Sequence, residues 1–164
     1  MRIRPTLCPL FSLIFTFAIL ALLASPAAAQ NQAGVVVDFG DGKIQPVCVK
    51  FSSSTIDGVQ LLQLAGFELD TEEGDYGTEI CSINELGCND PKPCFCQCSG
   101  DGEPCIDWNY WLLEEKNDKA RWTFSQDGPS DVKVKNNDVN GWVWGPYKQD
   151  QPPLLTIDQI CGDD

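Results

Sequence analysis

The side chains in this sequence best able to do chemistry are its cysteines, which either bind metals as thiolates or cross-link the chain. Nine occur, and Cys8 stands apart in an apolar N-terminal segment. The other eight are Cys48, Cys81, Cys88, Cys94, Cys96, Cys98, Cys105 and Cys161. An even number of cysteines in an exported chain is typical of a disulfide framework, and the 105 pairings that eight cysteines allow leave the connectivity open. We predict disulfides, provided that the chain leaves the cytoplasm.

A metal site is the rival interpretation of one part of this set. In Cys94-Phe95-Cys96-Gln97-Cys98 the cysteines alternate, so an extended backbone would point three sulfurs to one side, where they could bind a soft metal. No histidine occurs in the chain to share the coordination. We keep a Cys-cluster metal binder as the third functional hypothesis and predict disulfides, with no metal, as the first.

The first 29 residues predict export. Arg2 and Arg4 form a positive start, residues 7–24 are mostly apolar, and Ala27-Ala28-Ala29 supplies small residues for cleavage before Gln30. The alternative is an uncleaved anchor, because the apolar run is about as long as the shortest membrane-spanning helix. We favour cleavage because of the alanine cluster. The expected product is a secreted or extracytoplasmic protein with no membrane span after cleavage.

Aromatic residues are the second set with a potential function, and they crowd into the last third of the chain. On alternating strands Trp108 and Tyr110 share one face, and so do Trp142 and Trp144. Such rings most often pack across strands within a core. A single helix of about 11 residues covers only part of such a sheet, so we expect at least one ring at a binding surface. These four residues are the candidate ligand-binding residues.

Catalytic chemistry is poorly represented. The absence of histidine removes the commonest general base, and no nucleophile elbow, phosphate-binding loop or dinucleotide motif occurs. Glu72-Glu73 and Glu114-Glu115 offer carboxylates, but neighbouring residues on a strand point to opposite faces. The acidic segment 68–77 lacks the spacing of an EF-hand calcium loop, so we interpret it as a solvated loop. We predict a non-enzymatic protein without a cofactor.

The charge of the chain excludes some partners. The formal net charge is −13, and loss of Arg2 and Arg4 with the signal peptide makes it −15. Such a chain repels the phosphates of nucleic acids and anionic membrane surfaces. Cationic ligands stay open, although net charge alone does not identify them. The partners we expect are a small-molecule ligand or a protein of the cell surface.

Local patterns predict the elements that would position these residues. Two β-rich runs, 34–39 and 43–51, flank Asp41-Gly42 and predict a hairpin. Apolar residues at helical spacing predict a helix over 54–66, with Ser54 at its N-cap. Further short strands are predicted at 78–83, 107–114, 121–125, 131–135 and 139–144.

Several short motifs then occur in a characteristic order. They are Gly58-Val59-Gln60-Leu61-Leu62, Ile80-Cys81-Ser82-Ile83, Trp108-Asn109-Tyr110-Trp111, Gly128, and Asn137-Asp138 before Trp142-Val143-Trp144-Gly145. This order resembles the transcobalamin-like C-terminal domain family over roughly residues 34–145. The resemblance implies a β-grasp-like fold and a corrinoid as the ligand. Residues 84–107 depart from that pattern as a cysteine-rich insertion.

Together these observations predict one α+β domain. We expect a signal peptide over 1–29, a β-grasp-like domain over 30–146 and a polar tail over 147–164. The domain would have a mixed sheet, one helix packed across it and a disulfide-rich loop over 84–107. The leading hypothesis is an extracytoplasmic, non-enzymatic binding module for a corrinoid or another small ligand. The alternative is a structural or protein-interaction module of the cell surface, in which all the aromatic rings are core.

Overall fold

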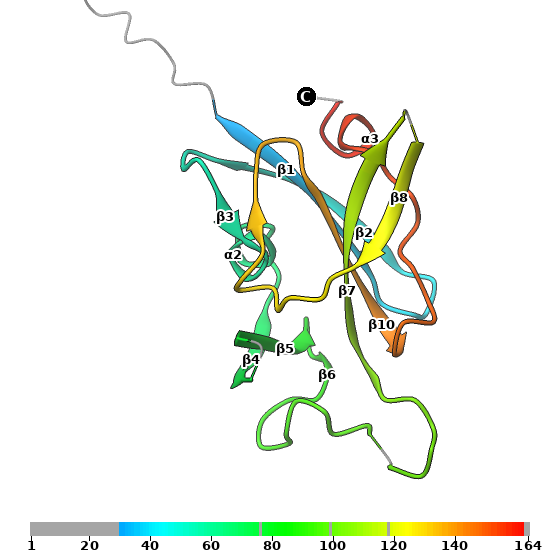
Figure 1. Ribbon diagram of the computed structural model, residues 1–164. Coiled ribbons are helices and arrows are strands. Elements are labelled where there is room, and N and C mark those ends of the chain that lie inside the picture. The colour runs from blue at the N-terminus through cyan, green and yellow to red at the C-terminus, as the bar shows by residue number, and fades with distance from the viewer. Residues whose placement is uncertain (1–29, 76, 99, 118, 163–164) are drawn as a thin grey trace, which may run out of the picture.

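The structure is a computed structural model that describes residues 30–162 except 76, 99 and 118 (Figure 1). The predicted signal peptide over 1–29 lies outside the described residues. Within the described part of the chain, no helix is long and apolar enough to cross a membrane.

A five-stranded sheet forms the centre of the molecule. Its strands are β1 (Asn31–Asp38), β2 (Ile44–Phe51), β7 (Ile106–Lys116), β8 (Lys119–Phe124) and β10 (Val139–Pro146), in the order β2-β1-β10-β7-β8. The first and last strands pair in parallel at the centre, and an antiparallel hairpin lies on each side. This is the β-grasp arrangement, so the predicted α+β fold class and the predicted first hairpin are confirmed, and the strands predicted at 107–114 and 121–125 pair as β7 and β8.

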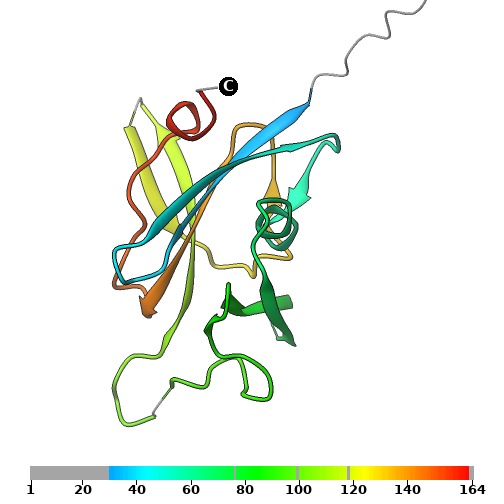
Figure 2. The ribbon, with the colours of Figure 1, turned by 180° about the vertical axis from the view of Figure 1, so that it is seen from behind.

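The two faces of this sheet bury two separate apolar clusters, because side chains alternate along each strand. On one face Val35, Val37, Tyr110 and Trp142 pack with Leu61 and Leu62 of helix α2 (Gly58–Leu64). On the other face Val36, Trp111, Trp122, Val139 and Val143 pack with Ile157 and Ile160 near the C-terminus. Those two isoleucines belong to helix α3 (Ile157–Cys161), which lies away from α2 in both views (Figures 1 and 2).

Helix α2 is shorter than predicted, and its start was wrong. The N-cap is Asp57 rather than Ser54: the Asp57 carboxylate accepts a hydrogen bond from the Gln60 amide, 2.8 Å, and the Gln60 side chain accepts one from the Asp57 amide, 3.1 Å. Ile56–Asp57 just before the helix is strand β3, which pairs with β9 (Lys133–Val134). The predicted helix began too early because Ile56, which fits the helical spacing of apolar residues, belongs to strand β3.

A three-stranded sheet lies below the large one in Figure 1 and consists of β4 (Leu69–Gly74), β5 (Gly77–Ile83) and β6 (Leu86–Gly87). Strand β4 corrects the prediction of a solvated loop over 68–77. Its acidic side chains are largely exposed, as expected, but its backbone pairs with β5. A strand of this kind has no apolar alternation for a sequence pattern to show.

All eight predicted cysteines form disulfides, which confirms that prediction and fits an extracytoplasmic protein. The pairs are Cys48–Cys161, Cys81–Cys94, Cys88–Cys96 and Cys98–Cys105. Three of them lie in or next to the disulfide-rich loop. The fourth links α3 to β2, so the end of the tail is fixed against the sheet.

Candidate functional site

Three of the four predicted ligand-binding residues lie side by side and line one cavity. Trp108, Tyr110 and Trp142 are almost completely buried in the face of the sheet that also carries α2. Tyr110 stacks on Trp142 with ring centroids 4.6 Å apart. The fourth, Trp144, contacts Trp108 at 5.5 Å but lines a different hollow, beside Gly40. The four therefore do not form a single surface.

The cavity, here called the aromatic cavity, has a volume of about 420 Å³. Six aromatic rings line it: Phe95, Trp108, Tyr110, Phe124, Trp142 and Tyr147. Three carboxyl groups line it as well, those of Glu79, Asp107 and Asp127. None of the described lining residues is a lysine or an arginine. It thus combines a largely aromatic wall with carboxyl groups.

The cavity exists because strand β8 is shorter than its partner β7. The pairing of the two strands runs from Lys116 opposite Lys119 to Trp111 opposite Phe124. In the described residues, the first part of β7 therefore has no ladder partner on that side. The Ser125 amide still donates to the Tyr110 carbonyl of β7, 2.9 Å. The chain then turns away through residues 126–129, and the space beside the start of β7 becomes the cavity.

Phe95 enters the cavity from the disulfide-rich loop. Both of its neighbours are cross-linked, Cys94 to Cys81 on β5 and Cys96 to Cys88 just after β6. The Cys96 amide also donates a hydrogen bond to the Cys88 sulfur, 3.1 Å. Phe95 remains 47% exposed although the backbone on both sides of it is cross-linked. The sequence contained this residue at the centre of the cysteine cluster, but only the pairing shows its function as a cavity wall.

The buried side chain of Asn109 connects two other parts of the cavity lining, Asp107 and the turn at Tyr147. Its amide nitrogen donates to the Gly145 carbonyl, 3.0 Å, and to the Asp107 carboxylate, 3.3 Å. Its oxygen accepts from the Lys148 amide, 2.7 Å. The Tyr147 amide in turn donates to the Cys105 carbonyl, 2.9 Å. One amide side chain therefore links the cavity carboxylate of Asp107 to the turn that carries Tyr147.

Tyr110 and Asn140 form a second buried polar contact. The Tyr110 hydroxyl donates to the Asn140 side-chain oxygen at 2.7 Å. Burial, with smaller contributions from the charges of Asp57 and Asp138, raises the pKa of Tyr110 far above its usual range. The phenol therefore stays protonated and acts as a fixed donor rather than as an acid or base.

The cavity carboxyl groups are electrostatically unusual. Burial raises the pKa of Asp107 to about 6, from an ordinary 3.8. Burial also raises the pKa of Glu79, and the nearby charges of Glu72 and Asp75 add to that rise. No ion pair between described residues involves Asp107. The site consequently holds a partly desolvated negative charge that no basic side chain compensates.

One ammonium group of the protein does reach the cavity rings. The Lys148 Nζ lies 4.4 Å from the centroid of the Phe124 ring and 4.8 Å from that of the Tyr147 ring. These distances are within the range of cation–π attraction. The two rings themselves meet edge to face at 5.3 Å.

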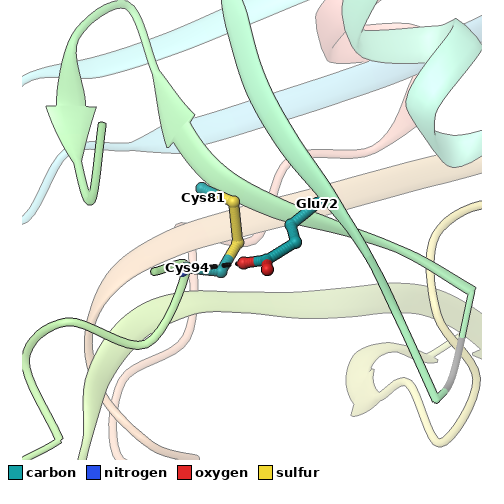
Figure 3. Close-up of side chains that lie close together, drawn as sticks. All are labelled: Glu72, Cys81 and Cys94. Atoms are coloured by element: carbon teal, nitrogen blue, oxygen red, sulfur yellow. Dashed lines mark hydrogen bonds between the residues drawn. A yellow bond between two sulfur atoms is a disulfide. The ribbon is translucent and has the colours of Figure 1, made fainter. Parts of the chain in front are cut away.

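The three cysteines that were considered as metal ligands form disulfides instead. The sulfurs of Cys94, Cys96 and Cys98 are in three separate disulfides, so in this oxidised form they offer no thiolate. Glu72 lies beside the Cys81–Cys94 disulfide, where its carboxylate accepts a hydrogen bond from the Cys94 amide, 3.1 Å (Figure 3). Glu72 therefore anchors the loop backbone.

Comparisons with known proteins do not assign the chain to a family. No protein-family model matches it, and no curated protein matches it. Among solved structures it is similar to a protein of Ruminococcus gnavus described as a "putative metal binding protein". That similarity has a TM-score of 0.45 and 17% identity, and it covers 71% of this chain and 97% of the other. A likeness at this level supports no functional argument, and the transcobalamin-like resemblance stays a prediction.

Proposed function

We propose that this protein is an extracytoplasmic binding module that takes a small ligand into the aromatic cavity. The observation that carries the proposal is the cavity itself: about 420 Å³ lined by six aromatic rings and a few polar groups. Pockets for small molecules have volumes of about 300–1,000 Å³ and this kind of lining. Phe95 and Tyr147 are each 47% exposed, so parts of the wall are open to solvent.

The proposal is for binding without catalysis. The chain contains no histidine, and the Ser125 hydroxyl in the cavity wall donates to the Asp127 carbonyl, 2.7 Å, rather than to a carboxylate base. Tyr110 is held as a neutral donor. A nucleophile paired with a general base, which acyl and phosphoryl transfer use, is thus not formed by these residues.

The kind of ligand we propose is based on the size and lining of the cavity, and not on the resemblance to the transcobalamin-like family. A corrinoid is the ligand that the transcobalamin-like resemblance implies, and it stays a prediction that a titration with cobalamin and cobinamide tests. The size and lining of the cavity favour a much smaller molecule. The alternative hypothesis is a purely structural module in which all the aromatic rings are core. It does not explain why the Phe95 ring is 47% exposed.

A fragment library that contains cationic, neutral and anionic compounds tests the proposal. Binding to the oxidised protein would be followed by nitrogen–proton NMR of the tryptophan indoles, of which Trp108 and Trp142 line the cavity. We expect some fragments to shift these two signals in a saturable way. In Phe95→Ala the same fragments should no longer shift them. The control is Leu64→Ala, since Leu64 is similarly exposed but lies on α2 outside the cavity lining. A library that shifts neither signal contradicts the proposal and favours the structural module.

A further inference from the structure

We infer that the ligand of the aromatic cavity is an alkylated ammonium cation, a class that includes quaternary ammonium compounds. This inference rests on the proposed function, because it names the ligand class of the same site. Three features of the cavity support it: the faces of its rings, the position of the Lys148 ammonium and the carboxyl groups in its wall.

Aromatic faces attract cations because the ring quadrupole is negative above and below the plane, and tryptophan is the strongest of the three rings. Two tryptophans and two tyrosines are among the six rings of the cavity. Trp108, Tyr110 and Trp142 are almost completely buried, so Phe95 and Tyr147, each 47% exposed, offer the most accessible ring surface. Alkyl groups on the ammonium add apolar contact with the same rings. They also reduce the hydration that a bare ammonium would have to give up on entry. Recognition of quaternary ammonium groups is a known use of such aromatic cages.

The protein already places an ammonium group against two of these rings. Lys148 Nζ lies 4.4 Å from the centroid of Phe124 and 4.8 Å from that of Tyr147. Lys148 itself is exposed, and its backbone is fixed by the hydrogen bond to Asn109. The rings are therefore arranged so that a cation is attracted to them, and a ligand cation would compete with Lys148 for their faces.

The carboxyl groups supply the charge that a cation would neutralise. Asp107 is half-buried, and no ion pair between described residues involves it. Glu79 is half-buried in the same wall. Removing a charge from water without a partner is unfavourable, and an organic cation in the cavity would provide that partner. An anion would instead meet three carboxyl groups and no described basic lining residue.

A bare metal ion fits this site less well than an organic cation. Calcium requires six to eight oxygen ligands, and aromatic rings provide none. In the described residues, the one group of three potential ligands that lie within 4.8 Å of one another is Glu72, Cys81 and Cys94. That group is outside the aromatic cavity, and two of its members form a disulfide.

Three probes that share a branched head group of three methyls and differ in charge test the inference. They are choline, its neutral carbon isostere 3,3-dimethylbutan-1-ol, and the anion 3,3-dimethylbutanoate. We would measure their affinities for the oxidised protein at pH 7.5 from the indole signals of Trp108 and Trp142. The expected order is cation, then neutral compound, then anion, with choline bound at least about tenfold more tightly than the alcohol. Equal binding of choline and the alcohol overturns the inference.

Two variants test which residues cause the preference for choline over the alcohol. Asp107→Asn keeps the size of the side chain and removes its charge, so choline affinity should fall by about tenfold while the alcohol binds as before. Glu115→Gln is the control, because Glu115 is an exposed acid on the same strand β7, outside the cavity lining. Lys148→Met removes the competing ammonium and should raise choline affinity by about two- to fivefold. Unchanged choline affinity in Asp107→Asn contradicts the inferred function of the carboxylate.

The outcomes separate this inference from the proposed function. If library fragments bind in the cavity and choline shows no preference over the alcohol, the binding function stands and the cation inference fails. If neither the library nor the three probes affect the cavity signals, both fail. The comparison of the three probes uses the wild-type protein alone, so it does not depend on any variant folding correctly.

Discussion

Asp107→Asn should make the folded protein more stable at neutral pH, because it removes the charge of a half-buried carboxyl group that contacts the buried Asn109. Asp107 is half-buried at the start of β7, and its contact with Asn109 is a long one, 3.3 Å. An asparagine at position 107 keeps the shape and an oxygen acceptor for that contact. What it removes is the cost of holding a charge in a partly dry site.

The pKa of Asp107 gives the magnitude. In the unfolded chain this carboxyl titrates near 3.8, and burial raises its pKa to about 6 in the folded protein. That difference corresponds to about 3 kcal/mol at most. Because the side chain is partly exposed and solvent screens it, we expect about half, roughly 1.5 kcal/mol.

The sign follows from proton linkage. Between pH 4 and 6 the folded protein binds more protons at Asp107 than the unfolded chain does, so the wild-type protein loses stability as pH rises through this range. Below pH 4 both states are protonated and the penalty disappears. The advantage of Asp107→Asn should therefore be near zero at pH 3.5, grow up to about pH 6.5 and stay constant above it.

Denaturation by urea of the oxidised proteins at pH 3.5 and pH 8 measures this difference. Glu115→Gln serves as the control, since Glu115 is exposed, and its difference from wild type should be within about 0.5 kcal/mol at both pH values. Equal stability of Asp107→Asn and wild type at pH 8 would refute the reasoning. A gain that is the same at both pH values would also refute it, because the Asp107 carboxyl of the folded protein is protonated and uncharged at pH 3.5.

Three other variants test the packing around the cavity. Tyr110→Phe leaves the buried acceptor of Asn140 without its donor and should lower the free energy of unfolding by about 1–3 kcal/mol in denaturant titrations. Gly58→Ala should destabilise by about 1–3 kcal/mol despite the better helix propensity of alanine, because its Cβ would lie 2.7 Å from the Tyr110 hydroxyl; a more stable variant would contradict this contact. Replacing Cys88 and Cys96 together by serine should cost about 2–3 kcal/mol and reduce choline affinity to that of Phe95→Ala; unchanged affinity would show that this disulfide does not position the ring.

Much of the fold could be predicted from local patterns because its strands are half-buried and alternate. The Asp41-Gly42 turn identified the first hairpin, and the alternation of Trp142, Val143 and Trp144 placed these residues on the correct faces. Strand β9 lies within the strand predicted over 131–135, whereas β3 and β4 were misassigned for opposite reasons. Strand β4 is too exposed to show an apolar pattern, and β3 continues the apolar spacing of the helix that follows it.

The candidate site could be predicted only in part, because its walls come from distant parts of the chain. Trp108, Tyr110 and Trp142 were selected from strand alternation alone, and all three line the cavity. Asp107 was not selected, although it directly precedes this aromatic strand. Only the end of β8 at Phe124 determines that the edge of β7 is open beside it. Chain pairing of that kind is not visible in the spacing of residues along one strand.

The cysteines and the aromatic residues, treated as separate features in the sequence, act on the same cavity. Cys94 and Cys96 were considered as metal ligands because alternate residues share one side of an extended segment. In disulfides, both instead fix the backbone on either side of Phe95. A largely exposed ring would otherwise cost conformational entropy to hold in place for a ligand, and cross-links reduce that cost before binding. One wall of the cavity, Trp108, Tyr110 and Trp142, is thus held by the main core, and the opposing ring of Phe95 is held by disulfides before any ligand arrives.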